Sequence, residues 1–162
     1  MTGYANILRQ ADIFFHIADE QLEHIAGLCS ERTFQTGEII FPEGSSSSEL
    51  YVIVQGEVDI LVDPALVSGR SQHEIQPVTI ATLRRGQSFG EIALVDPGLR
   101  SATARAIQNN TRLLILPRVQ LLEYCAAELS LGYQLMQNLA ADLALKMRSS
   151  DLLIREKLLY SQ

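Results

Sequence analysis

The pattern of hydrophobic and polar positions divides the chain into three parts. In the first part, apolar residues recur at helical spacing after a helix-start signal at Asp19. Short β-rich runs separated by turn residues follow, and helical spacing then returns and continues almost to the end. The pattern therefore predicts helices over 1–33, a β-rich region over 34–117 and helices over 118–160.

The β-rich runs of the middle part are short and regularly spaced. They are GEIIF (37–41), LYVIVQGEVDILV (50–62), PVTIATL (77–83), ATARAI (102–107) and TRLLILP (111–117). Many short strands at about 8–12-residue spacing are typical of a sandwich or barrel. The polar stretch 63–76 is expected to form a longer loop. A chain of 162 residues suits one domain with one core, so we predict a single domain over 1–162.

Composition narrows the classes of function. Hydrophobic residues make up 47% of the chain and charged residues 20%, as in ordinary globular proteins. No apolar run approaches the ~18 residues of a membrane span, and the N-terminus lacks a secretory signal pattern. We therefore expect a cytoplasmic protein without a membrane partner. The net charge of −6, with no basic cluster beyond Arg84-Arg85, argues against direct nucleic-acid binding.

Residues typical of redox, metal or catalytic chemistry are sparse. Cys29 and Cys125 lie far apart and are expected to be reduced structural thiols. His16, His24 and His73 lack metal-ligand spacing, and the first two are expected at helix surfaces. No nucleophile or phosphate-loop motif is present, so we expect neither an enzyme nor a metal site.

The segment Phe89–Ala104, FGEIALVDPGLRSATA, has the residues that an anion site needs. Gly90 permits close approach to a ligand, and a helical turn after it presents N–H groups that favour an anion. Arg100, at the start of an apolar strand, requires an anionic partner such as phosphate. Glu91 would repel a phosphate but accept a hydrogen bond from a sugar hydroxyl. The residues alone leave a simpler alternative, an ion pair between Glu91 and Arg100.

This segment resembles the phosphate-binding cassette of the cyclic-nucleotide-binding domain family. The family pattern is Phe-Gly-Glu, an aliphatic residue, a small residue and Leu, then a variable stretch, Arg, a small residue and Ala. The chain matches it at Phe89, Gly90, Glu91, Ile92, Ala93, Leu94, Arg100, Ser101 and Ala102. GEIIFPEG (37–44), LYVIVQGEVDI (50–60) and Gly86 also look like the family's early strands and turns. The resemblance implies an α+β fold, an eight-stranded β-roll flanked by N-terminal helices and a long C-terminal helix.

The resemblance also implies roles for the cassette residues (89–104). Arg100 would hold the cyclic phosphate and Glu91 the ribose 2′-hydroxyl, while Gly90 and Ala93 would offer N–H groups. Ile92 belongs to the same turn, and Ser101 and Ala102 would supply an N–H group and a small wall.

By the same resemblance, Phe41, Ile60 and Ile80 would flank the purine, with ordinary core positions as the alternative. Ser101 favours cAMP over cGMP as the ligand, and no metal is implied.

The last predicted helix, 130–160, carries apolar residues on more than one face. A near-heptad series runs through Met136, Ala140, Leu143, Met147, Ser150, Ile154 and Leu158. In the family this helix caps the nucleotide or forms the dimer seam, and packing on the β-roll alone is the alternative. Because a helix that is apolar on more than one face suggests two partners, we predict a homodimer. Lys146 or Arg148 would reach the base. The sequence lacks the helix-turn-helix of transcription-factor relatives. We therefore expect a stand-alone sensor that acts on an effector protein, with the sensory part of a transcription regulator as the alternative.

Overall fold

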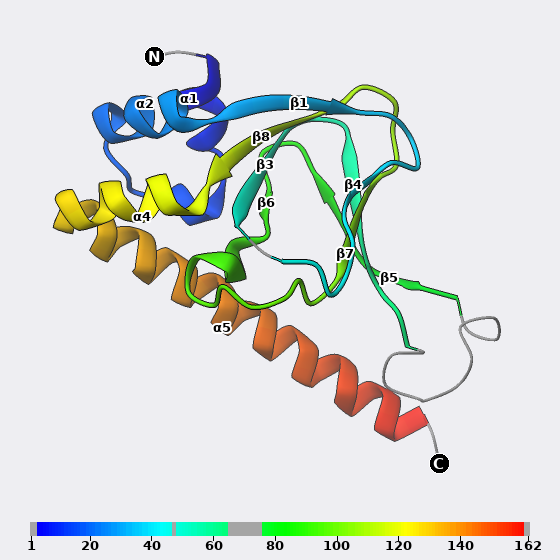
Figure 1. Cartoon of the computed structure of the whole chain (residues 1–162). Coiled ribbons are helices and arrows are strands. Elements are labelled where there is room, and N and C mark those ends of the chain that lie inside the picture. Colours follow the sequence, from blue (N-terminus) through cyan, green and yellow to red (C-terminus); the bar gives the residue numbers. More distant parts are fainter. Residues whose placement is uncertain (1–2, 47, 65–75, 161–162) are drawn as a thin grey trace.

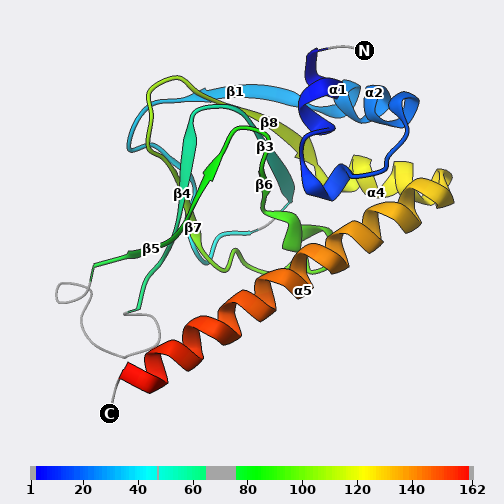
Figure 2. The ribbon, with the colours of Figure 1, turned by 180° about the vertical axis from the view of Figure 1, so that it is seen from behind.

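The structure is a computed structural model that describes residues 3–46, 48–64 and 76–160. It contains two antiparallel four-stranded sheets that form a roll, with helices at one side and a long helix beneath (Figures 1 and 2). The predicted fold class is therefore confirmed. Residues 65–75 of the expected loop, including His73, lie outside the described residues.

The order of elements follows the three parts of the hydrophobic pattern. The helices and 3₁₀ turns are α1 (Gly3–Leu8), η1 (Asp12–Phe14), α2 (Asp19–Leu28), η2 (Glu91–Leu94), α4 (Arg118–Ala127) and α5 (Leu129–Tyr160). The strands are β1 (Ser30–Phe34), β2 (Ile39–Phe41), β3 (Glu49–Gln55), β4 (Glu57–Val62), β5 (Val78–Arg84), β6 (Ser88–Phe89), β7 (Thr103–Ala106) and β8 (Thr111–Pro117). Helix α2 begins at the predicted Asp19.

The two sheets have the strand orders β1-β8-β3-β6 and β2-β7-β4-β5. Strand β1 begins at Ser30, inside the range 1–33 that the sequence assigns to helices. Only Phe34 of this strand is buried, so its sequence, SERTF, carries no alternating apolar signal. The strand forms through its antiparallel pairing with β8, which runs from Ser30 opposite Ile115 to Phe34 opposite Thr111.

Strands β3 and β8 separate two hydrophobic clusters. Leu50 and Val52 of β3 pack with the helices, whereas Tyr51 and Ile53 pack inside the roll. Successive side chains of a strand point to opposite faces, so an uninterrupted apolar run is buried on both sides. The sheet that carries the cassette strand β6 is therefore supported by the helices behind it.

Helix α5 is attached to the rest of the chain at its first half. Leu131, Leu135 and Leu139 are buried in the helix-side cluster. Asn138 donates hydrogen bonds from Nδ2 to the carbonyl oxygens of Ile13 (3.0 Å) and Phe15 (2.7 Å). These contacts fix the root of α5 against η1.

The second half of α5 leaves the core and passes below η2 and the roll (Figures 1 and 2). The predicted near-heptad series divides at this point. Met136 and Leu143 pack against the core, whereas Met147, Ile154 and Leu158 are exposed. None of the helices in the described ranges has the length and apolar character needed to cross a membrane.

Candidate functional site

A cavity of about 730 Å³ lies between the cassette, strands β4 and β5, and the second half of α5. All the site residues predicted from the sequence line it. They are Phe41, Ile60, Ile80, Gly90, Glu91, Ile92, Ala93, Arg100, Ser101 and Ala102. The structure thus places residues from distant parts of the sequence around one space, although their roles stay predictions.

The turn η2 forms at the predicted position and begins after Gly90. Gly90 has a positive φ of 78°, a conformation that side chains disfavour. A Cβ at this position would lie 2.6 Å from Nη1 of Arg100 and 3.2 Å from the carbonyl oxygen of Glu49. Glycine is therefore required here both by the backbone conformation and by the close approach of Arg100. The N–H group of Ala93 donates to the carbonyl oxygen of Gly90 at 3.2 Å, so it is already bonded in this structure.

Arg100 is buried, with 7% of its surface exposed. Its Nη2 donates to the carbonyl oxygen of Glu49 (2.8 Å) and its Nη1 to that of Gly90 (3.3 Å). The guanidinium carbon lies 4.1 Å from the ring centroid of Phe41. Nε of Arg100 is buried and has no hydrogen-bond partner. Burial lowers the pKa of this guanidinium, and a buried donor without a partner costs about 1–3 kcal/mol. The positive charge of Arg100 and its unpaired Nε–H group therefore fit an anionic ligand.

Glu91 is also buried, with 6% of its surface exposed, and Lys146 of α5 is its ion-pair partner. Lys146 also pairs with Asp142 at 2.7 Å. Burial lowers the pKa of Lys146, but the two carboxylates more than offset this effect, and its pKa is raised. Glu91 and Arg100, which are both described, do not form the alternative ion pair. The carboxylate of Glu91 pairs with Lys146 instead.

The residues expected around the purine differ in burial. Ile80 is 58% exposed, so the core alternative does not hold for it. Ile60 and Phe41 are partly buried and pack against the cluster inside the roll, so the core alternative holds for them, and their contact with the purine stays a prediction. In addition, the guanidinium of Arg100 lies over the ring of Phe41.

Helix α5 forms one wall of the cavity, and the sequence predicts only part of its lining. Asp142, Leu145, Ser149 and Ile154 line the cavity together with Lys146. The sequence predicts that Lys146 or Arg148 reaches the base, but in the structure Lys146 contacts Glu91. Arg148 is not among the described residues that line the cavity. The spacing of Asp142 and Lys146, one helical turn apart, was the available signal that the lysine is held in place.

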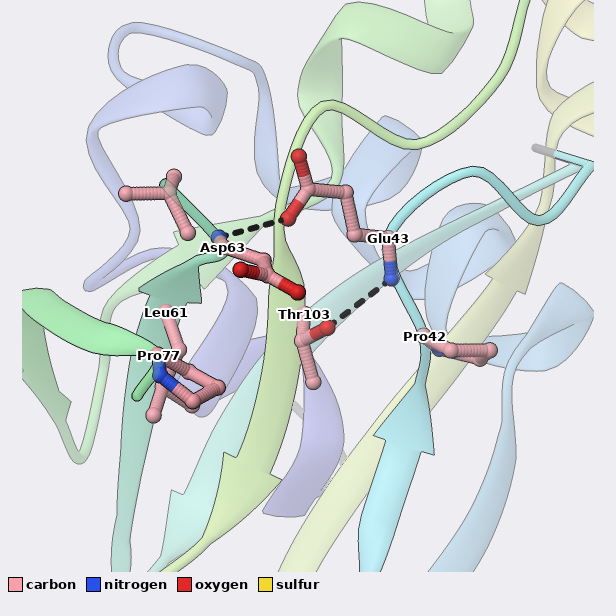
Figure 3. A pocket seen from close by; sticks show the side chains of 7 residues that line it. Pro42, Glu43, Leu61, Asp63, Pro77 and Thr103 are labelled. Atoms are coloured by element: carbon pink, nitrogen blue, oxygen red, sulfur yellow. Dashed lines mark hydrogen bonds between the residues drawn. The ribbon is translucent and has the colours of Figure 1, made fainter. Parts of the chain in front are cut away.

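A smaller cavity of about 220 Å³ lies beside strands β4 and β7 (Figure 3). Glu43 is fixed there by two hydrogen bonds. Its N–H group donates to Oγ1 of Thr103 (2.9 Å), and its carboxylate accepts from the N–H group of Asp63 (3.0 Å). The polar groups of Glu43 therefore tie the end of β2 to β4 and β7, which is a structural role.

Other reactive side chains give no competing site in the described residues. Burial raises the pKa of Cys29 to about 12 and also raises that of Cys125. A thiol with a raised pKa is a poor nucleophile because little thiolate is present. Within the same residues, no group of three or more His, Cys, Asp or Glu side chains is placed to hold a metal ion. His24 lies on the surface of α2, as expected, and His16 is exposed in the turn after η1.

Comparison with known proteins decides the family. The model of the family described as "Cyclic nucleotide-binding domain" matches residues 31–128, which include both sheets and the cassette. The chain belongs to this family. The match ends at residue 128, just before α5 begins at Leu129. It therefore does not include α5, which forms one wall of the cavity in this cyclic nucleotide-binding domain.

Relatives of this domain occur in larger proteins. The cyclic AMP receptor protein of Thermus thermophilus is 32% identical over 145 residues, which are 90% of this chain and 61% of that protein. Human cGMP-dependent protein kinase 2 is 28% identical over 115 residues, 71% of this chain and 14% of the kinase. The crystal structure of the Thermus thermophilus catabolite activator protein has a TM-score of 0.72 and 32% identity, and the match covers 89% of this chain and 62% of that one. The chain spans less than two thirds of the length of each of these relatives.

The geometry of Gly90 leads to a prediction for Gly90→Ala. The added Cβ should displace the Arg100 guanidinium and destabilise the fold, by about 1–2 kcal/mol from the left-handed backbone and about 1–3 kcal/mol from overpacking. Urea unfolding measures this loss. Gly98→Ala is the matched control: φ is not positive there, and the atom that its Cβ would meet is the carboxylate of Asp96, at the end of a side chain. Equal stability of the two variants would contradict the prediction.

Proposed function

We propose that this cyclic nucleotide-binding domain binds cAMP in preference to cGMP and acts as a sensor. The observation that supports this most directly is the buried guanidinium of Arg100. It lines a cavity of about 730 Å³ and has a buried Nε without a partner. An oxygen of a cyclic phosphate would satisfy that donor, and hydrogen bonds to charged groups are stronger than neutral ones.

In the proposed complex, Arg100 binds the cyclic phosphate and Glu91 accepts a hydrogen bond from the ribose 2′-hydroxyl. Lys146 supports this assignment because its positive charge offsets the repulsion between the Glu91 carboxylate and the phosphate. A lone carboxylate would repel the phosphate, whereas Glu91 is neutralised by the ammonium group that contacts its Oε1. Its other oxygen, Oε2, is the proposed acceptor. Gly90, Ile92 and Ala93 shape the turn, and Ser101 and Ala102 lie on the wall beside it.

The preference for cAMP rests on Ser101 and on the resemblance of the cassette to those of cAMP-binding relatives. Ile60 and Ile80 form the proposed apolar wall for the base, together with the α5 side of the cavity. The named relatives include both a cyclic AMP receptor and a cGMP-dependent kinase. The choice between the two nucleotides is therefore part of the proposal.

The proposed output of the sensor is a change at α5. Lys146 joins this helix to Glu91, so a ligand that engages Glu91 acts on a group already bonded to α5. We propose that the helix passes the bound state to an effector protein in the cytoplasm, and that the domain itself catalyses no reaction and contacts no nucleic acid. A second candidate is the sensory part of a transcription regulator. The likeness to the N-terminal domain of a transcriptional regulator from Streptomyces coelicolor, which is 26% identical with a TM-score of 0.72, favours it.

Calorimetric titration tests the ligand assignment. The parent protein should bind cAMP more tightly than cGMP. Arg100→Ala should lose at least about tenfold in affinity for either nucleotide, because a hydrogen bond to a charged group contributes ~1.5–3 kcal/mol. Arg84→Ala is the control, since Arg84 is exposed, pairs with Glu57 and does not line the cavity. Absence of binding by the parent protein would refute the proposed function.

The same titration separates the roles of the two cassette residues. Glu91→Gln should weaken cAMP binding, but it should have little further effect on 2′-deoxy-cAMP, which lacks the proposed hydroxyl. A similar loss for both ligands would contradict the role of Glu91 while leaving that of Arg100 intact.

Hydrogen–deuterium exchange tests the output through α5. Saturating cAMP should change the protection of residues 118–160, because a ligand shifts a conformational equilibrium by its differential affinity for the two states. Lys146→Ala should reduce this change. Identical protection with and without ligand would contradict the relay.

We also propose that the 130–160 helix pairs with a second copy of the chain. Its second half exposes Leu145, Met147, Leu152, Ile154 and Leu158, and such a run of exposed apolar residues typically marks an interface. Analytical ultracentrifugation should therefore detect a dimer that Leu158→Glu weakens. A monomer at all accessible concentrations would exclude this pairing.

A further inference from the structure

The sequence predicts Phe41 beside the purine, and the structure places its ring against the guanidinium of Arg100. The guanidinium carbon of Arg100 lies 4.1 Å from the centroid of the Phe41 ring, and the ring of Tyr51 is farther away at 5.5 Å. A cation over a ring face is attracted by the negative charge density there. One face of the Phe41 ring is therefore covered by the guanidinium of Arg100.

The Phe41 ring is itself held in a fixed orientation. Phe41 ends β2 and lies opposite Ala104 in the pairing with β7. Its ring centroid is 5.4 Å from that of Tyr51 and 5.9 Å from that of Phe89. Tyr51 and Phe89 are in turn stacked, with centroids 5.1 Å apart. Phe41 thus belongs to an aromatic group inside the roll, and the guanidinium of Arg100 lies over its ring.

Arg100 depends on such a neighbour because it is buried. Its Nη1 and Nη2 donate to two main-chain carbonyl oxygens, and the side chains of Tyr51 and Glu49 are further neighbours of the guanidinium. A buried cation must recover much of its lost hydration from the surrounding groups. The carbonyls act on the Nη1 and Nη2 edge of the guanidinium, and the Phe41 ring acts on its face. Together they hold the side chain while Nε stays without a partner.

We infer that Phe41 is a positioning residue for Arg100: its ring face holds the guanidinium in the orientation that receives the anionic group of the ligand. This inference rests on the proposed function, in which Arg100 binds the cyclic phosphate. It differs from the expected role of Phe41 beside the purine in one measurable respect. A residue that acts through Arg100 contributes equally to the binding of every nucleotide with the same cyclic phosphate, whatever its base.

Progressive fluorination of Phe41 tests the inference. Replacement of Phe41 by mono-, di- and trifluorophenylalanine weakens the negative ring face while nearly preserving its shape. The affinity for cAMP should fall stepwise, by about three- to thirtyfold over the series, and the affinity for cGMP should fall by the same factor. Phe34 is the matched control. Arg32 lies over its ring at 4.7 Å, but Phe34 does not line the cavity, so fluorination there should leave both affinities unchanged.

Two results of the titrations would overturn the inference. Unchanged affinity across the Phe41 series would show that the ring face does not act on Arg100. A loss that differs between cAMP and cGMP would assign Phe41 to the base instead.

Urea unfolding without ligand separates the contact from the proposed function. Fluorination of Phe41 should lower the stability of the parent protein but not that of Arg100→Met, where the cation is absent. Equal losses in the two backgrounds would overturn the contact. A parent protein that binds neither nucleotide would refute the proposed function and the positioning role together, whereas the unfolding comparison would still decide whether Phe41 supports Arg100.

Discussion

The burial of one guanidinium group is the constraint on which the site depends. A cation that leaves water must regain most of its lost solvation from nearby dipoles. Around Arg100, main-chain carbonyls and the ring of Phe41 provide this compensation. The carbonyl of Gly90 can approach because that residue has no Cβ, and the carbonyl of Glu49 is presented by the start of β3. The cassette, β2 and β3 are thus tied together by the requirements of one side chain.

Local patterns in the sequence were sufficient for much of the fold. The start of α2 at Asp19, the β-rich runs and the turn Glu91–Leu94 follow from spacing and from turn residues within a few positions. Strand β1 could not be predicted in this way, because its exposed polar residues become a strand only by pairing with β8. The same limit applied to the site. The cassette residues could be located from the resemblance, but Lys146 lies 55 positions from Glu91 and no periodicity links the two.

The two hydrophobic clusters are not independent, because β3 contributes to both. Leu50 and Val52 belong to the helix-side cluster, and Tyr51 and Ile53 belong to the cluster inside the roll. Tyr51 also contacts Phe41, so the same strand supports the aromatic group next to Arg100. Loss of the helix-side packing would therefore disturb the backbone that presents the site.

The attachment of α5 at one end gives this helix the mechanics of a lever. Among the described side chains of this helix, Leu143 is the last that packs against the helix-side cluster, and the helix continues to Tyr160. At a rise of about 1.5 Å per residue, the free arm is roughly 25 Å long, so a tilt of about 5° at its root moves the tip by roughly 2 Å. The pair between Lys146 and Glu91 lies close to the pivot, where small displacements are multiplied along the arm. If α5 moves as a rigid rod, a displacement of atomic size at the carboxylate would therefore become one of side-chain size at the far end of the helix.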